Sequence, residues 1–165
     1  MIYLSFVGNH DKGNPEGPGP ALTVFFQYSD NITDVYILQS PKSEGGDYPK
    51  IANYISRQMA SFKPEVNVNI LPVDIIDPTD YKHVYSTMLH EIQNIKTEDK
   101  SDKYIVNISS GTPTMTVCWV LIKNLGVLQN VNLIQSVNPR FRHRNVSTNE
   151  VNFDFIDIPK SVEPE

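Results

Sequence analysis

Only one cysteine, Cys118, occurs in this chain of 165 residues. One cysteine cannot form a disulfide within the chain, and such scarcity is typical of proteins from a reducing compartment, so we expect a cytoplasmic protein. The neighbours of Cys118 are apolar, and no helper group lies beside it in the sequence. These features favour a small buried hydrophobe over a catalytic thiol.

A membrane-spanning segment and a targeting signal are missing as well. No apolar run approaches the roughly 18 residues that a bilayer-spanning helix needs, and residues 2–7 follow Met1 directly as a strand-like run without a basic leader. The net charge of −5 lacks the positive excess of proteins that bind long nucleic acids. We therefore expect neither a membrane nor a long nucleic acid as a partner, whereas a small anion in one local pocket stays compatible with this charge.

Common catalytic and nucleotide-binding signatures are also absent. The glycines of residues 8–19 are too scattered for G-x-G-x-x-G, and no Walker A pattern occurs. Residues 109–111, Ser-Ser-Gly, do not form the G-x-S-x-G of a nucleophile elbow. His83 and His90 are seven residues apart, whereas a metal-chelating pair on one helix needs a spacing of four. We expect no metal and no cofactor, and we assign no catalytic residue.

The most informative stretch that the chain does contain runs from residue 104 to residue 126. Residues 104–108 predict a buried strand, and a Ser-Ser-Gly turn of little bulk follows. Thr112 fits a helix N-cap and Pro113 the first helical position. Residues 115–125 are apolar nearly all round, so we expect a deeply buried helix that ends at Gly126. Its N-terminus offers free backbone N–H groups and positive dipole charge, which suits a phosphate.

Strand-like and helix-like segments alternate along the whole chain. This alternation predicts an α/β, three-layer Rossmann-like fold: a mostly parallel central sheet of about six strands, helices on both faces, and an antiparallel edge strand. We expect one domain over residues 1–158 and a tail or linker stub over residues 159–165. The strands are expected at residues 2–7, 34–39, 66–71, 104–108, 131–137 and 150–158. Besides the helix that follows Thr112, helices are expected at residues 21–28 (whose composition also fits a strand), at 47–62, and from an N-cap at Asp77 onward. A charged surface loop is expected at residues 97–102, and Phe25, Phe26, Tyr81, Tyr85 and Trp119 fall at core spacing.

Ligands of such sheets bind beyond the carboxyl ends of the strands, where the strand order reverses. The loop of residues 8–14 and the turn of residues 109–114 follow the two strands that are candidates for this place. A basic segment at residues 139–145 follows the fifth strand, and it is either a solvated edge loop or a phosphate contact on the same rim. His10, Asp11 and Lys12 are open to the same two interpretations. The candidate ligand-binding residues are Gly8, Asn9, His10, Asp11, Ser109, Ser110, Gly111, Thr112, Pro113, Arg140, Arg142 and His143.

Two of these segments carry a resemblance to a known family. A Gly-Asn-His-Asp loop follows the short first strand, and residues 107–115 read Asn-Ile-Ser-Ser-Gly-Thr-Pro-Thr-Met. Further support comes from Ile-Asp-Pro-Thr-Asp-Tyr at residues 76–81, Cys-Trp at 118–119 and Leu-Ile-Gln-Ser at 133–136. Over residues 1–158 the chain resembles the CRISPR-associated Rossmann fold (CARF) family. It is most similar to the N-terminal sensor of the RNA-terminal-phosphate-cyclase regulators.

The resemblance implies a homodimer that binds one cyclic oligoadenylate, the tetra- or hexa-adenylate ring, in CRISPR type III antiviral signalling. A ring with its own symmetry matches an interface to which each subunit contributes the same patch. The resemblance also implies an effector domain outside this chain, under the sensor's control. Two alternatives stay open: a ring nuclease that cleaves its ligand, and a transcriptional regulator domain that senses RNA ends. The lack of an obvious nucleophile or base favours a binding module over an enzyme.

Overall fold

A six-stranded sheet forms the centre of the protein, of which the computed structural model describes residues 1–98, 103–142 and 146–152. The strand order is β3-β2-β1-β4-β5-β6, with β1 to β5 parallel and β6 antiparallel to β5. This arrangement confirms the predicted Rossmann-like sheet, and its order reverses between β1 and β4. The strands are β1 (Ile2–Phe6), β2 (Asp34–Gln39), β3 (Asn67–Pro72), β4 (Tyr104–Asn107), β5 (Val131–Ser136) and β6 (Thr148–Glu150).

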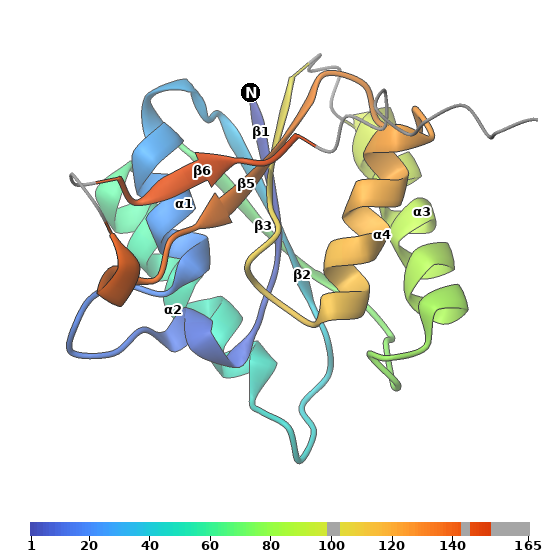
Figure 1. The fold of residues 1–165 in the computed structure, drawn as a ribbon, viewed down its shortest axis with the longest axis horizontal. Coiled ribbons are helices and arrows are strands. Elements are labelled where there is room, and N and C mark those ends of the chain that lie inside the picture. Colours follow the sequence, from blue (N-terminus) through green and yellow to red (C-terminus); the bar gives the residue numbers. More distant parts are fainter. Residues whose placement is uncertain (99–102, 143–145, 153–165) are drawn as a thin grey trace, which may run out of the picture.

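Helices cover both faces of the sheet, which gives the three predicted layers (Figure 1). The α-helices are α1 (Pro20–Tyr28), α2 (Tyr48–Phe62), α3 (Tyr81–Glu98) and α4 (Pro113–Asn124), and the 3₁₀ turns are η1 (Asn9–Lys12), η2 (Ser29–Asn31) and η3 (Pro139–Phe141). In Figure 1 the sheet is seen nearly edge-on, with α1 and α2 on one side and α3 and α4 on the other. Residues 21–28 are therefore helical, and their alternative interpretation as a strand is wrong.

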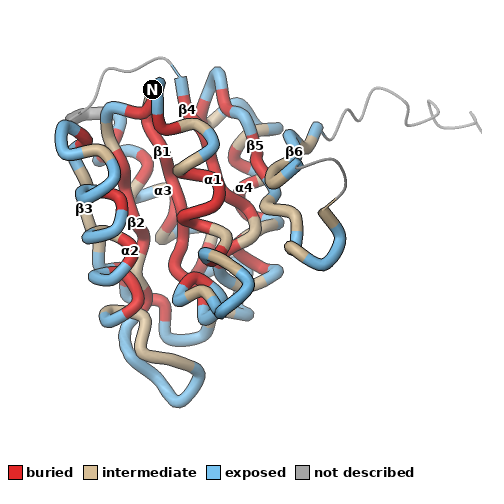
Figure 2. The backbone as a smooth tube through the Cα atoms, turned by 90° about the vertical axis from the view of Figure 1, so that its left-hand side faces the viewer, coloured by how far each residue is buried: buried red, intermediate tan, exposed pale blue. Residues whose placement is uncertain are grey.

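Two hydrophobic cores form because side chains alternate between the faces of each strand. On β1, Leu4 and Phe6 belong to the core under α3 and α4, whereas Tyr3 belongs to the core under α1 and α2. Every residue of β1 is buried, as the red central strand in Figure 2 shows. Cys118 is buried in the first of these cores, as expected for a small hydrophobe. None of the helices in the described residues combines the length and apolar character that crossing a bilayer demands.

Several element boundaries differ from the sequence predictions. Helix α3 begins at Tyr81 rather than after Asp77, because Asp80 caps it by accepting the His83 amide at 3.1 Å. Asp77 instead closes a local turn by accepting from the amide and hydroxyl of Thr79. Strand β6 spans Thr148–Glu150, and residues 153–158 of the predicted edge strand lie outside the described residues. Helix α3 continues through residues 97–98 of the predicted charged loop, and residues 99–102 also lie outside the described part, as do the predicted tail residues 159–165.

The prediction that α4 is buried nearly all round is wrong for one face. Val117, Leu121 and Leu125 are 40%, 41% and 66% exposed, whereas Trp119 on the opposite face is buried. The apolar composition could not reveal this difference, since α3 and the sheet together cover only part of the helix circumference. Tyr81, predicted at core spacing, is 52% exposed at the start of α3.

Candidate ligand-binding site

The loops that follow the parallel strands gather along one edge of the sheet, at the bottom of Figure 1. There the loop after β1 touches the turn after β4, backbone against backbone. A Cβ added to Gly8 would lie 2.7 Å from the Gly111 amide nitrogen. Gly111 itself has a φ of 90°, and its Cβ would lie 2.5 Å from the Met115 Sδ. The two predicted loops are thus brought together, and glycine permits their close contact.

The buried carboxylate of Asp11 holds the two loops in contact. Its Oδ2 accepts the Gly8 amide at 2.7 Å, and its Oδ1 accepts the Ala21 amide and the Ser110 hydroxyl, each at 2.8 Å. Asp11 therefore ties together η1, the first turn of α1 and the turn after β4. Burial raises its pKa above the ordinary aspartate range, whereas the three hydrogen bonds act in the opposite direction.

The network continues from Ser110 into the sheet through Asn107. The Asn107 side-chain amide donates to the Ser110 hydroxyl at 2.7 Å and to the Ser5 hydroxyl at 3.0 Å, and its oxygen accepts the Ser109 amide at 3.0 Å. Ser109 in turn accepts the Ser136 amide of β5 at 2.8 Å. Both turn serines are therefore held by side-chain hydrogen bonds. Asn107 was not among the predicted site residues, although an asparagine within a buried strand indicates a side chain that needs hydrogen-bond partners.

Helix α4 begins at this turn as predicted. Thr112 is its N-cap: the hydroxyl accepts the Met115 amide at 3.4 Å and donates to the Pro78 carbonyl at 2.9 Å. Among the described residues, the amides of Gly111 and Thr114 have no protein hydrogen-bond acceptor. These amides, together with the helix dipole, make the start of α4 favourable for an anion.

A cavity of about 320 Å³, here called the central crevice, opens beside the Gly8–Gly111 contact. The turn after β4 contributes Gly111 and Thr112, and the loop after β1 contributes Asn9 and His10. Tyr48 of α2 and Met115 of α4 also line the crevice, together with two loops that were not among the predicted site segments. Their lining residues are Ser40, Pro41, Lys42 and Ser43 after β2, and Ile75, Ile76 and Pro78 after β3. For the first of these loops the sequence does contain a signal: residues 40–46, Ser-Pro-Lys-Ser-Glu-Gly-Gly, come directly after a predicted strand and have the small and polar composition of a binding loop.

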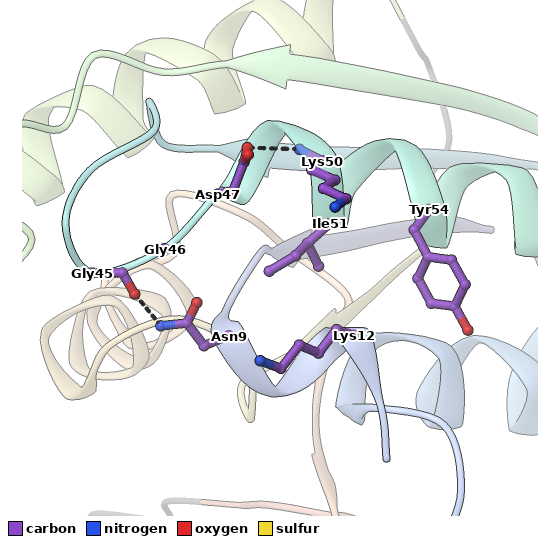
Figure 3. Close-up of a pocket in the computed structure, with 8 residues that line it drawn as sticks. All are labelled: Asn9, Lys12, Gly45, Gly46, Asp47, Lys50, Ile51 and Tyr54. Atoms are coloured by element: carbon purple, nitrogen blue, oxygen red, sulfur yellow. Dashed lines mark hydrogen bonds between the residues drawn. The ribbon is translucent and has the colours of Figure 1, made fainter. Parts of the chain in front are cut away.

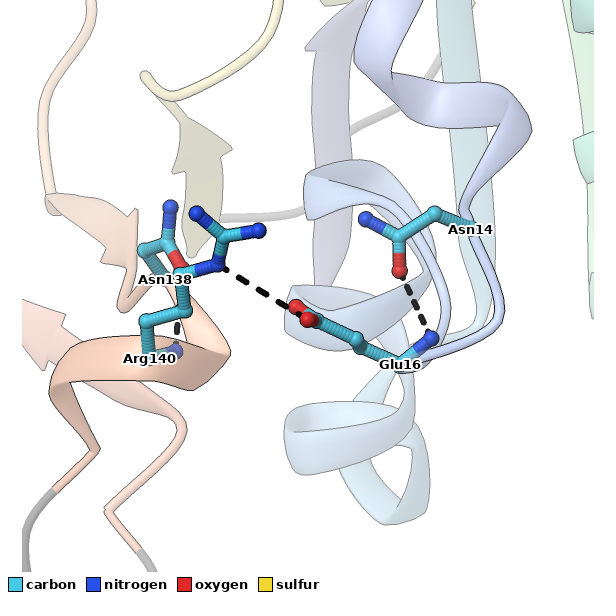
Figure 4. A network of polar contacts seen from close by, with 4 residues as sticks. All are labelled: Asn14, Glu16, Asn138 and Arg140. Carbon is cyan, nitrogen blue, oxygen red and sulfur yellow. Dashed lines mark hydrogen bonds and ion pairs between the residues drawn. The ribbon is translucent and has the colours of Figure 1, made fainter.

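A second cavity, the rim cavity, has a volume of about 530 Å³ and lies between the loop after β1 and the loop after β5. Arg140 and Arg142 line it, so these predicted cations do reach the same edge of the sheet. Arg140 forms an ion pair of 3.7 Å with Glu16, as Figure 4 shows, and Arg142 donates to the Val137 carbonyl. His143, the last predicted site residue, lies outside the described residues.

The candidate residues thus divide into two groups. Asn9, His10 and Gly111 are exposed at the crevice or its rim, whereas Asp11 and Ser110 are buried and hold the loops in place. Pro113 is exposed at the first position of α4. In the described part of the chain, no group of three histidine, cysteine or carboxylate side chains could hold a metal ion. The arrangement is suited to binding an anion through backbone amides.

Known proteins show where this fold occurs. Among solved structures, Csm6 of Enterococcus italicus bound to cyclic hexa-2′-fluoro-hexa-dAMP is similar to this chain, with a TM-score of 0.73 and 18% identity over 86% of this chain and 34% of that one. This match establishes a shared fold. The transcriptional regulatory protein RtcR of Escherichia coli (strain K12) is 26% identical over 106 residues, which cover 64% of this chain and 20% of the relative. The chain therefore spans a fifth of the RtcR length and about a third of the Csm6 length.

The profile of the family described as "Regulator of RNA terminal phosphate cyclase" matches residues 20–162. The match leaves out β1 and the loop that follows it, and it includes the turn after β4 and the start of α4. Together with the Csm6 likeness, it confirms the CARF-like fold and the resemblance that the sequence motifs indicate. The chain belongs to the family of regulators of RNA terminal phosphate cyclase.

Proposed function

We propose that this domain is a sensor that binds a cyclic oligoadenylate, the tetra- or hexa-adenylate ring, in CRISPR type III signalling, and that it controls an effector joined to it. The observation that carries the proposal is the start of α4, where the amides of Gly111 and Thr114 are unpartnered among the described residues, beside the central crevice. A phosphate of the ring would accept these amides. The solved Csm6 complex supports the ligand class, because a protein with the same fold holds a cyclic hexanucleotide.

The second part of the proposal is a homodimer in which two copies of the crevice face one ring. The exposed face of α4, formed by Val117 and Leu121 and continued by the C-cap residue Leu125, supports it. These side chains recur every four residues, so they form one apolar stripe along the helix. A stripe of this kind is suited to self-association, because a twofold interface buries the same patch of both copies. The stripe starts one helical turn from the crevice, which would bring both crevices near the twofold axis.

The experiment is a calorimetric titration with cyclic tri-, tetra- and hexa-adenylate. Pro113→Glu should weaken binding at least tenfold, since the new carboxylate occupies the anion position while suiting the helix N-terminus. Pro113→Gln has the same size without the charge and should bind almost as the parent does. Absence of heat with all three rings would refute the sensor proposal. Chromatography of the bound mixture tests the ring-nuclease alternative, because linear product at a useful rate would make the protein an enzyme.

A second candidate function follows from the family itself. The family is described as regulators of RNA terminal phosphate cyclase, and the relative RtcR of Escherichia coli is a transcriptional regulatory protein. In this alternative the domain is part of a transcriptional regulator, and its ligand is an RNA end. The same crevice amides would accept a terminal phosphate. Short RNAs that end in a 3′-phosphate or a 3′-hydroxyl separate the two candidates. Tight binding of the phosphorylated end only, with no heat from the rings, would favour the RNA-end regulator.

A further inference from the structure

A third cavity, of about 630 Å³, lies between η1, the hairpin of residues 43–46 and α2, and it shares Asn9 and Lys12 with the rim cavity. We call it the side cavity. Figure 3 shows Lys12 from η1 and Lys50 from α2 on either side of Ile51, with Tyr54 one turn further along α2. The volume lies within the usual range for small-molecule sites. Neither Gly111 nor any other residue of the turn after β4 lines this cavity.

Hydrogen bonds hold the wall of the side cavity in place. Ser43 and Gly46 exchange two backbone hydrogen bonds, of 3.0 and 3.2 Å, and the Ser43 hydroxyl accepts the Gly45 amide. The Asn9 side chain donates to the Gly45 carbonyl, which attaches this small hairpin to η1. Asp47 caps α2 by accepting the Lys50 amide. The side chain of Ile51, which is 8% exposed, forms an apolar floor.

The side cavity has two cations, Lys12 and Lys50, that are unpaired in the described part of the chain. Lys12 and Lys50 form no ion pair or hydrogen bond through their amino groups within the described residues. Asp47, the single carboxylate of the lining, is already paired with Lys42 at 3.3 Å. Helix α2 contains no acidic residue at all. In a chain of net charge −5, two free cations around one cavity give that cavity a local positive charge, which favours an anion.

An exposed aromatic ring lies beside these cations. Tyr54 is 43% exposed and lines the side cavity together with two adjoining depressions. Lys50, Tyr54 and Arg57 are spaced at i, i+4 and i+7, so they share one face of α2. A cation pair for phosphate next to an aromatic face for a base is the combination with which proteins hold nucleotides irrespective of base identity.

From this combination we infer that the side cavity is a nucleotide-binding site, separate from the central crevice. The phosphate lies between Lys12 and Lys50, and the base stacks on Tyr54. The nucleotide is either a free nucleoside monophosphate or one unit of a short single-stranded nucleic acid. Arg57, which lines the adjoining depression with Lys50 and Tyr54, would contact the next phosphate of such a strand. The inference does not depend on the ring-binding proposal, because none of these four side chains lines the crevice.

The test is a binding titration of the whole chain with AMP, UMP, inorganic phosphate, and tetranucleotides of RNA and DNA. Lys50→Ala and Tyr54→Ala should each weaken nucleotide binding at least about fivefold, and Tyr54→Phe should restore it because the ring is kept. Lys82→Ala is the matched control: it removes an exposed lysine from the first turn of α3, across the sheet. Pro113→Glu should leave nucleotide binding intact, which separates this site from the crevice.

The two sources of the nucleotide differ in affinity and in salt dependence. If the tetranucleotide binds more than tenfold tighter than AMP, with a log–log salt slope near −0.7 per phosphate contacted, the ligand is a single strand. Equal affinity identifies the free nucleotide. The inference is overturned if no probe binds the parent chain, if Lys82→Ala weakens binding as much as Lys50→Ala, or if Tyr54→Ala changes nothing.

Discussion

Asp11 shows how one side chain can belong to a site without facing the ligand. From the sequence it is a polar residue in a polar loop and thus a candidate ligand contact. In the structure its carboxylate is fully buried and accepts from Gly8, Ala21 and Ser110. Since each of these donors comes from a different segment of the edge, we assign Asp11 to positioning the loops. Sequence spacing could not reveal this role, because Ser110 is 99 residues away.

Replacement of Asp11 by asparagine should destabilise the protein by about 1–3 kcal/mol at pH 5. The amide has the same shape, but its NH₂ group must then face the backbone N–H of either Gly8 or Ala21, and both of these are donors. Urea denaturation measures the loss. Asn14→Ala serves as a control, because this exposed residue bonds through its side chain only to the nearby Glu16 amide and should change the free energy of unfolding by less than about 0.5 kcal/mol.

The destabilisation should shrink as the pH rises. Burial raises the pKa of Asp11 in the folded state, so the folded protein holds this proton more tightly than the unfolded chain does. The resulting stability is fully present below the unfolded pKa of about 3.9 and is lost as the pH rises through the folded pKa. The asparagine side chain of the variant does not titrate. The stability difference between parent and Asp11→Asn, measured from pH 4 to pH 8, should therefore decrease. An increase would show that the three hydrogen bonds outweigh burial and lower the pKa of Asp11 in the folded state.

Gly111 and Gly126 provide a matched pair of glycines on either side of α4. Both have positive φ, of 90° and 69°, but only at Gly111 would a Cβ meet neighbours, at 2.5 Å from the Met115 Sδ and 3.2 Å from the Phe6 Cβ. Gly126→Ala should lower the free energy of unfolding by roughly 1–2 kcal/mol through backbone strain alone. Gly111→Ala should lower the free energy of unfolding further, because its Cβ also overlaps with core side chains. Thermal unfolding of the two variants measures the difference, and equal melting temperatures would show that the loop relaxes freely.

Helices α3 and α4 show which features of an element a sequence encodes. The N-cap of α4 was predictable, because the Thr112 hydroxyl acts within its own first turn. The start of α3 was not, since Asp77 and Asp80 both precede a polar stretch and only the fold decides which of them caps the helix. The apolar composition of α4 predicts burial, but how much of its surface is covered depends on its neighbours. The composition therefore could not distinguish a core residue from an exposed one such as Leu121.

A charged residue on the exposed face of α4 tests whether that face is the dimer interface. Leu121→Glu should shift the monomer–dimer equilibrium toward the monomer at least tenfold, because desolvating an unpaired carboxylate in an apolar interface is unfavourable. The monomer should remain folded, since Leu121 is 41% exposed. Val146→Glu, at an equally exposed apolar residue elsewhere (45%), controls for added charge. Analytical ultracentrifugation would exclude this interface if both variants dimerise like the parent.

The sheet could be predicted almost completely, whereas the walls of the site could only be predicted in part. The central strands β1, β2 and β4 are short apolar runs, and the alternation of strands with helices determines the layers. Of the loops at the carboxyl edge, the sequence indicated those after β1 and β4 and, as one of two interpretations, the basic loop after β5. The loops after β2 and β3 line the same crevice. They lie there because β2 pairs with β1 and β3 with β2, and the composition of a loop does not predict this strand order. Strand order therefore contributes what loop composition cannot.

Ligand binding at that edge should stabilise the entire fold, because the crevice is built from loops of four strands and does not exist in the unfolded chain. A ring present at 100 times its dissociation constant should add about 2.7 kcal/mol to the free energy of unfolding. For a domain of this size that corresponds to a rise in melting temperature of roughly 5–10 °C. Trp119, the single tryptophan, reports this transition well, since it is buried on α4 against Phe6 of β1. At the same ring concentration the Pro113→Glu variant should show at most about half of this shift, because its carboxylate competes for the same amides and a tenfold weaker binding adds only about 1.4 kcal/mol. If that variant were stabilised as much as the parent, the ring would bind away from the start of α4, and the placement of the ligand at Gly111 and Thr114 would be wrong.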